Sequence, residues 1–328
     1  MPRSEPEAQG GLGPSDGPEP TGNNSQINEA PGFSSEALEA FRARVREQGA
    51  ELYRDLPWRR TRDPYEIWIS EVMLQQTQVS RVDGRWQRWL ARFGSVAELA
   101  RADAADVLDE WQGLGYNRRA LAVHRAAQTI MGAGGEFPRE ASALTALPGI
   151  GPATAAGIRA FAFDLHGVYL ETNVRTVMLH ELFAGREGVA DRELVPLVEA
   201  TCPPDGGFAA GKGGVGARDD HADDHADDPR SWYYAMLDYG AYLKRTVPNP
   251  SRRSSGHARQ SRFEGSRRQK RAALVRALLA RREGASVDAL VAAVVAEGIE
   301  LDRALAAEIL ADLAAEGFCR ETNGLWRP

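Results

Sequence analysis

Two glutamates in different surroundings could act as a general acid and a stabilising charge. Glu71 is the only charge in WISEVMLQQTQV (residues 68–79), a stretch otherwise suited to a buried helix. Burial raises the pKa of a carboxyl group, and a raised pKa suits a proton donor at neutral pH. The open alternative is a structural ion pair between Glu71 and an arginine such as Arg59 or Arg175.

The second glutamate, Glu171, lies in YLETNVRTV (residues 169–177), at the end of an apolar stretch and the start of a helix. Thr172 or Asn173 could cap that helix. One interpretation is an ionised carboxylate facing a cleft. The alternative is an acid at a helix N-terminus that the helix dipole stabilises.

A glycine loop, ALPGIGPATAAGI (residues 146–158), precedes another helix. Gly149 and Gly151 permit positive φ angles and close approach of another group, and Pro148 presets the turn. Backbone N–H groups before a helix N-terminus suit an anion. A plain helix–helix connection is the alternative. The small residues that follow favour a helix-hairpin-helix, which grips DNA phosphates without reading sequence.

Composition limits the class of protein. The 328 residues carry a net charge of -6, but the excess acid lies in residues 1–32 and 205–228 and leaves the remainder net positive. A positive face therefore remains possible. No apolar run reaches membrane-spanning length, so no membrane association is expected. Cys202 and Cys319 form no disulfide framework, and a cytoplasmic, nucleoid-associated setting is expected.

The pattern of apolar residues predicts an all-α chain. Residues 1–33 are expected to be a disordered tail, and residues 34–247 a helical core. The low-complexity stretch 205–228 is interpreted as a flexible insert, with a histidine–aspartate metal tract as the weaker alternative.

A basic linker is predicted at 248–266, followed by a C-terminal domain. Arg252, Arg253, Arg267 and Arg268 are candidate phosphate contacts, because arginines neutralise phosphates. Residues 267–328 predict three helices and a hairpin with an Asn323-Gly324 turn, a winged-helix-like arrangement. Its third helix is acidic, so packing or protein docking is at least as suitable a role as DNA reading.

Four blocks occur in order: LPW…DPYEIWISEVMLQQTQV, WQGLGYNRRALAVHRAA, GEFP…ALPGIGPATAAGI and YLETNVRTV. Together they resemble the endonuclease III superfamily of helix-hairpin-helix DNA glycosylases, most of all the adenine glycosylase (MutY) branch. The resemblance covers roughly residues 36–247. It implies a two-domain all-α fold, with a barrel at about 60–170, a second lobe from 34–59 and 171–247, and an active site between them.

The resemblance also implies roles. Glu71 matches the general acid that protonates the departing base, and Glu171 lies where the family has an aspartate that supports the sugar cation. Gln76 and Tyr116 match residues that wedge into the duplex beside the flipped nucleotide. The target nucleotide must leave the base stack before its glycosidic bond can be cut. Asn173 matches a residue near the sugar–phosphate of that nucleotide. Arg59 is assigned to the base pocket.

Position 153 bears on the reaction type. Bifunctional members carry a lysine where this chain has Ala153, and that lysine attacks the sugar and leads to strand cleavage. Alanine offers no nucleophile. We therefore expect water to attack and the reaction to stop at the abasic site, without β-lyase activity.

The chain departs from the adenine glycosylase branch in three ways. Two cysteines cannot supply the four thiolates of an iron–sulfur cluster, so no cofactor and no metal are expected. The C-terminal region does not resemble the Nudix-like domain that recognises 8-oxoguanine. This chain has a glutamate, Glu171, at the position where the family has an aspartate.

The sequence thus predicts a monomeric, monofunctional DNA glycosylase of base-excision repair that acts on double-stranded DNA containing a lesion or mismatch. Adenine opposite 8-oxoguanine or guanine is the first candidate substrate. A thymine or uracil mismatch glycosylase, or a modified-base glycosylase, is a second interpretation. A non-catalytic DNA-binding regulator is the third.

Overall fold

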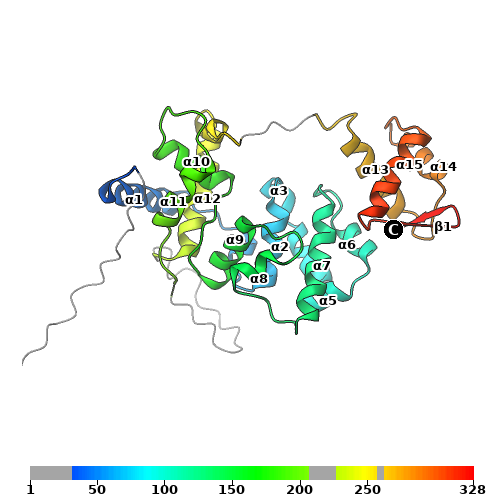
Figure 1. Cartoon of the computed structure of the whole chain (residues 1–328), viewed down its shortest axis with the longest axis horizontal. Helices are drawn as coiled ribbons and strands as arrows, with labels where there is room; N and C mark the ends of the chain where they lie inside the picture. Colours follow the sequence, from blue (N-terminus) through cyan, green and yellow to red (C-terminus); the bar gives the residue numbers. More distant parts are fainter. Residues whose placement is uncertain (1–31, 207–226, 257–261) are drawn as a thin grey trace, which may run out of the picture.

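Helices dominate the computed structural model, which describes residues 32–206, 227–256 and 262–328 (Figure 1). The predicted all-α class is confirmed. Most of the predicted tail and insert lies outside the described residues. The helices of the first two ranges are α1 (Ser35–Glu51), η1 (Pro57–Arg59), α2 (Pro64–Leu74), α3 (Val79–Val82), α4 (Arg85–Arg92), α5 (Val96–Arg101), α6 (Ala104–Glu110), α7 (Arg118–Gly132), α8 (Ala141–Thr145), α9 (Pro152–Phe163), α10 (Thr172–Glu181), α11 (Asp191–Thr201), α12 (Pro229–Thr246) and η2 (Pro250–Arg253).

Helix α2 lies in the first lobe, which comprises the helices from α2 to α9, and it packs against α9 (Figure 1). Its start is fixed by Asp63, whose side chain accepts hydrogen bonds from two backbone N–H groups, and by Pro64 at the first helical position. Nearly every side is apolar and buried, including Ile67, Trp68 and Ile69. A polar residue on this helix therefore lies among core side chains.

The second lobe joins the N-terminal helix to segments much later in the chain. Helix α12 packs against α1 and α10. Gly240 lets α12 approach α10 closely, because a Cβ at this position would overlap the backbone of Asn173. This contact fixes the start of α10, where Glu171 lies, against α12.

Asp164 holds both ends of the segment that contains the predicted insert. Its carbonyl accepts from the N–H of Gly206 at 2.8 Å, and its carboxylate accepts from the N–H of Arg230 at 3.2 Å. Asp227 pairs with Arg42 at 2.9 Å. The ends of the predicted insert are therefore bonded to the core.

The basic stretch predicted as a linker begins as part of the core. Helix η2 packs against α10, and Arg253 donates to the carbonyls of Leu179 and Phe183 at the end of that helix. Val189 and Ser254 form a β-bridge. Carbonyl groups at a helix end have no intrahelical N–H partner, and the guanidinium of Arg253 donates hydrogen bonds to them instead.

The C-terminal region places three helices and a hairpin where the sequence predicts them: α13 (Arg267–Leu279), α14 (Val287–Ala296), α15 (Arg303–Ala315), β1 (Arg320–Thr322) and β2 (Leu325–Arg327). The strands pair antiparallel around Asn323-Gly324. The assignment as a winged helix stays a prediction. No described helix is long and apolar enough to cross a membrane.

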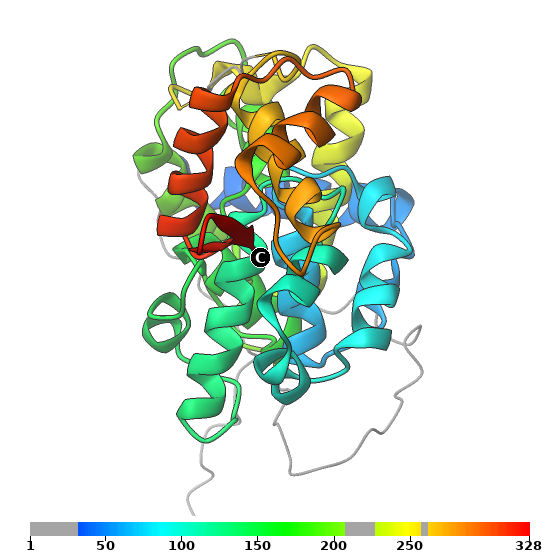
Figure 2. The ribbon, with the colours of Figure 1, turned by 90° about the vertical axis from the view of Figure 1, so that its right-hand side faces the viewer.

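The C-terminal region lies beside the first lobe at α6 and α7 (Figures 1 and 2). Arg282 pairs with Asp106 of α6 at 2.6 Å. Arg118 of α7 donates to Glu316, the residue after α15, at 2.6 Å. The acidic end of α15 thus contacts the core, in line with the packing role that its charge suggested.

Candidate active site

Glu71 lies on the apolar helix α2, and its side chain is partly buried. The hydroxyl of Tyr169 donates to its Oε2 at 2.9 Å. Burial raises the pKa of Glu71 to about 7, the hydrogen bond from Tyr169 lowers it, and the charge of Glu171 raises it. Glu71 therefore holds a proton for part of the time at neutral pH.

The arginines proposed as alternative partners of Glu71 pair elsewhere. Arg59 forms a bidentate ion pair with Asp238, at 2.7 and 2.8 Å, and lies 4.3 Å from the ring centroid of Tyr234. Arg175 pairs with Asp191 at 2.8 Å. The side chain of Arg59 is almost fully buried, so the pair holds η1 against α12. Its assignment to the base pocket stays a prediction.

Gly157 of α9 leaves the space that the Glu71 carboxylate occupies. A Cβ at this position would lie 2.5 Å from Oε2 of Glu71 and 2.8 Å from Cε2 of Tyr169. Both distances are too short for an unbonded contact. The contact between α2 and α9 thus determines where the carboxylate lies.

Glu171 is the N-cap of α10. Its Oε1 accepts from the backbone N–H groups of Asn173 at 2.5 Å and Val174 at 3.1 Å. Burial raises the pKa of Glu171, while the backbone hydrogen bonds and the charge of Lys244 oppose the rise. The side chain, one methylene longer than aspartate, folds back onto its own helix.

The two carboxylates interact across the boundary between the lobes. Glu71 comes from α2 of the first lobe and Glu171 from the start of α10 in the second. Their charges are close enough that Glu171 contributes to the raised pKa of Glu71. Oδ1 of Asn173, two residues after Glu171, is buried without a hydrogen-bond partner among the described residues. The arrangement favours one protonated and one ionised carboxyl group.

Gln76 and Tyr116 are exposed residues with left-handed backbones, at φ 52° and 49°. Such angles are rare for side chains other than glycine and gather at functional sites. Each residue lies in a short loop, after α2 and before α7. Their assigned role in the duplex stays a prediction, but both have a feature that the sequence did not indicate.

The glycine loop forms the predicted turn. Gly149 has φ 78°, and a Cβ there would lie 2.6 Å from Cβ of Ala122. Gly151 is the extended N-cap of α9 and faces open space. Its open side suits the approach of a phosphate, which stays a prediction. Nε2 of Gln75 donates to Thr154 at 3.0 Å and ties this loop to the end of α2.

The four candidate arginines differ in their surroundings. Arg252 is exposed. The guanidinium of Arg253 is bonded to carbonyls of the core, and Arg267 pairs with Glu308 at 3.0 Å and with Asp312 at 2.7 Å. Arg268 lies 5.9 Å from the ring centroid of Phe263. Arg253 and Arg267 therefore have structural partners that the sequence did not reveal.

Sequence reasoning missed three residues around the site: Tyr169, Gly157 and Arg119. Tyr169 and Gly157 looked like core and packing residues, and only the fold brings them to Glu71. Arg119 lies in the first turn of α7 and bonds to the loops of Gln76 and Tyr116. A charged residue next to GLGY was a signal, although a weak one.

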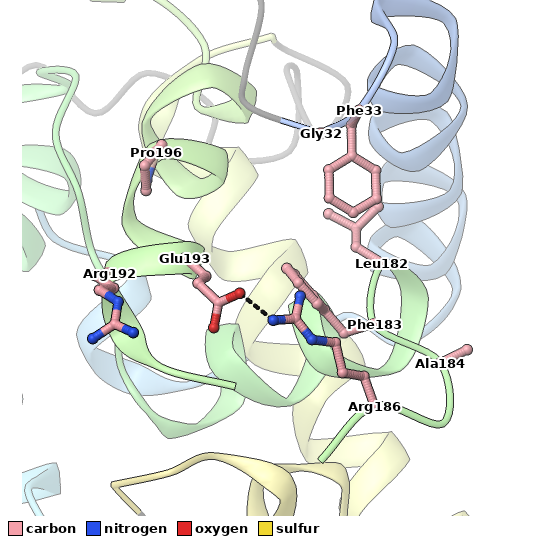
Figure 3. A pocket seen from close by; sticks show the side chains of 9 residues that line it. All are labelled: Gly32, Phe33, Leu182, Phe183, Ala184, Arg186, Arg192, Glu193 and Pro196. Carbon is pink, nitrogen blue, oxygen red and sulfur yellow. Dashed lines mark hydrogen bonds and ion pairs between the residues drawn. The ribbon is translucent and has the colours of Figure 1, made fainter. Parts of the chain in front are cut away.

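A pocket of about 550 Å³ lies elsewhere, between the start of α1 and the α10–α11 connection (Figure 3). Phe33 and Phe183 line it, and Arg186 pairs with Glu193 at its wall. None of the candidate catalytic residues lines this pocket. It therefore gives no information on the chemistry of Glu71.

The residues present do not fit a four-thiolate iron–sulfur cluster. The chain has two cysteines, Cys202 after α11 and Cys319 before β1, and both are buried. Within the described ranges, no group of three or more histidine, cysteine or acidic side chains could hold a metal ion.

Residues 69–229 match the HhH-GPD superfamily of base excision DNA repair proteins. The matched stretch covers just under half of the chain and contains Glu71, the glycine loop and Glu171. The expected resemblance is thereby confirmed.

Among curated relatives, the adenine DNA glycosylase of Mycolicibacterium smegmatis is 39% identical over 154 residues, which cover 46% of this chain and 53% of the relative. The adenine DNA glycosylase of Mus musculus is 37% identical over 149 residues, covering 42% and 29%. The chain thus spans about half the length of the bacterial relative, and less of the mouse relative.

A solved thermostable thymine-DNA glycosylase has a similar fold, with a TM-score of 0.50 and 21% identity. The match covers 63% of this chain and 87% of that protein. At this identity the likeness concerns the fold alone.

Proposed function

We propose that this protein is a monofunctional DNA glycosylase of base-excision repair that hydrolyses the N-glycosidic bond of adenine opposite 8-oxoguanine or guanine. The observation that carries the proposal is the pair Glu71 and Glu171, two interacting carboxyl groups of different environment at the boundary between the lobes. The similarity to adenine DNA glycosylases supports the choice of base.

Glycosidic cleavage needs a proton for the leaving base and negative charge near a cationic sugar. Glu71, with its pKa raised to about 7, supplies the proton. Glu171 accepts two backbone hydrogen bonds, which favour its ionised form, and faces the developing positive charge. Water then attacks the sugar, since Ala153 offers no amine.

DNA reaches the site in three steps of recognition. The glycine loop and exposed arginines bind phosphates without regard to sequence. Gln76 and Tyr116 enter the duplex, and the target nucleotide turns outward into the site. Asn173, beside Glu171, then contacts its sugar–phosphate. In this proposal the protein acts as a monomer, in the nucleoid, without a cofactor.

A lesion panel tests the proposal. Purified protein is incubated with duplexes that carry adenine opposite 8-oxoguanine, adenine opposite guanine, and thymine or uracil opposite guanine. Alkali then reveals abasic sites, and samples without alkali reveal lyase activity. We expect alkali-dependent cleavage of the adenine duplexes, and none with Glu71→Gln. Equal behaviour of wild type and Glu71→Gln on every duplex would favour a non-catalytic regulator.

A mismatch-specific thymine or uracil glycosylase is the second candidate. The family match ends at residue 229, so the C-terminal region at α6 and α7 lies outside it. A different C-terminal region leaves room for a different opposite-base preference. Excision of thymine or uracil, with adenine left intact, would identify this activity.

The absence of an iron–sulfur cluster is tested on anaerobically purified protein. Two cysteines predict a colourless protein, without the absorbance near 400 nm that such clusters give. Stoichiometric iron and sulfide would contradict the prediction.

A further inference from the structure

Arg119 bonds to the end of the helix that carries Glu71. Its Nη1 donates to the carbonyls of Val72 at 2.7 Å and Gln75 at 2.6 Å. These carbonyls lie in the last turn and at the C-cap of α2, where no intrahelical N–H can reach them. Arg119 thus fixes the course of the chain just before Gln76.

The other nitrogen of the same guanidinium holds the second loop. Nη2 donates to the carbonyls of Leu114 at 3.2 Å and Gly115 at 3.1 Å, the residues just before Tyr116. The guanidinium also lies 5.4 Å from the ring centroid of Tyr116. One planar group therefore contacts both loops, which are about forty residues apart in the chain.

The partners of Arg119 are neutral. They are backbone carbonyls, the hydroxyl of Thr77, and the faces of Trp111 and Tyr116. Among the residues that the structure describes, no carboxylate forms an ion pair with Arg119. A half-buried cation without an anionic partner is costly, so its position here needs a reason beyond simple ion pairing.

The backbones of the two loops supply that reason. Gln76 and Tyr116 both have left-handed φ angles, and such residues persist only where their surroundings impose the conformation. Arg119 bonds to the residue before each of them. Both side chains are exposed on the bonded loops.

We propose that Arg119 is a positioning residue that holds Gln76 and Tyr116 as one rigid unit for insertion into duplex DNA. Opening of the duplex, rather than cleavage of the glycosidic bond, then depends on it. The proposal rests on the proposed function in taking DNA as the ligand, but not on which base is removed.

The test uses a duplex that contains a tetrahydrofuran abasic analogue flanked by 2-aminopurine, whose fluorescence rises when the bases unstack. Stopped-flow mixing with wild-type protein should give a fast rise. Arg119→Ala and Arg119→Lys should slow it by about tenfold or more, because a lysine cannot span both loops. Affinity for an undamaged duplex should change by no more than about threefold, since phosphate contacts dominate it.

Arg118→Ala is the matched control, because it removes the same charge one residue away, where the guanidinium pairs with Glu316. It should retain the fast rise. Thermal unfolding checks that each variant is folded. If Arg119→Ala does not fold, the fluorescence of Arg119→Lys alone tests the proposal. A wild-type rise in a folded Arg119→Lys variant would overturn the proposal, as would no rise with wild type.

The analogue carries no base, so this readout does not depend on excision. If the lesion panel shows no excision while the fluorescence depends on Arg119, the proposed function fails and the positioning role stands. If excision occurs and the Arg119 substitutions leave the fluorescence rise unchanged, the proposed function stands and the positioning role fails.

Discussion

The hydroxyl of Tyr169 donates a hydrogen bond of 2.9 Å to the carboxylate of Glu71, a residue 98 positions earlier in the chain. Tyr169 is itself held by the rings of Phe161 and Tyr233, at centroid distances of 5.3 Å each. The bond therefore has a fixed direction. It connects the proposed proton donor to the segment that leads into Glu171.

Tyr169→Phe should extend activity to higher pH. The hydrogen bond lowers the pKa of Glu71, so its removal raises that pKa above about 7 and keeps the carboxyl protonated longer. The alkaline limb of the single-turnover rate should move up by about one pH unit, the scale of one hydrogen bond to a charged group. A profile that moves down instead would contradict this account.

Glu71→Gln should stabilise the protein at alkaline pH while abolishing excision. Because the folded-state pKa of Glu71 lies above its unfolded value, its contribution to stability is full below pH 4.5 and is lost as the pH rises through about 7. Glutamine keeps the shape without the charge. Melting at pH 8 should show a gain on the order of 1 to 3 kcal/mol, and melting at pH 4 little difference.

Gly157→Ala should displace the proton donor. The new methyl group would lie 2.5 Å from Glu71 and 2.8 Å from Tyr169, so the carboxylate must move. We expect a loss of about a hundredfold in single-turnover rate, as for a misplacement of about 1 Å. Gly132→Ala in α7 is the control: nothing lies within 4 Å, and it should add about 0.5 to 1 kcal/mol of stability.

Glu171→Gln and Glu171→Asp separate charge from capping. Loss of the charge should slow excision by about 10² to 10³, as for a preorganised electrostatic group. Glu171→Asp keeps charge and cap but shortens the arm of a side chain that folds back, so it should be slower than wild type and equally stable. Full activity in Glu171→Gln would reduce this residue to a helix cap.

Adjacent arginines should behave differently. Arg253→Ala removes hydrogen bonds to Leu179 and Phe183 and should cost about 1 to 3 kcal/mol of stability. Arg252→Ala removes an exposed charge and should leave the melting temperature unchanged, while the salt slope of DNA binding falls by about 0.9 if Arg252 contacts a phosphate. Identical effects of the two changes would contradict the distinction.

The sequence predicted the local features of this fold well. The glycine loop carries its own turn signal, and Gly149 has the positive φ that glycine permits. It also isolated Glu71, because one charge in an apolar helix is visible without a structure. Contacts between distant segments could not be predicted. Neither the Arg59–Asp238 pair nor the Tyr169–Glu71 bond has a local pattern.

Arginine roles were the hardest to predict from sequence. A basic stretch looks the same whether its side chains face phosphate or cap a helix, and Arg253 and Arg267 proved to have partners within the protein. Left-handed backbones at Gln76 and Tyr116 were equally hidden, because neither residue type favours them. Such conformations arise from tertiary contacts, here those of Arg119.

The hydrogen bonds of Asp164 allow the stretch of chain between Gly206 and Arg230 to change in length. Asp164 bonds to Gly206 and to Arg230, so the polypeptide leaves the core and returns to it at one residue. A closed junction of this kind isolates the helices on either side from whatever lies between. The entropy of closing a loop grows only slowly with its length. Evolution can therefore lengthen, shorten or replace the intervening stretch, and a reporter domain inserted there should leave the two carboxylates where they are.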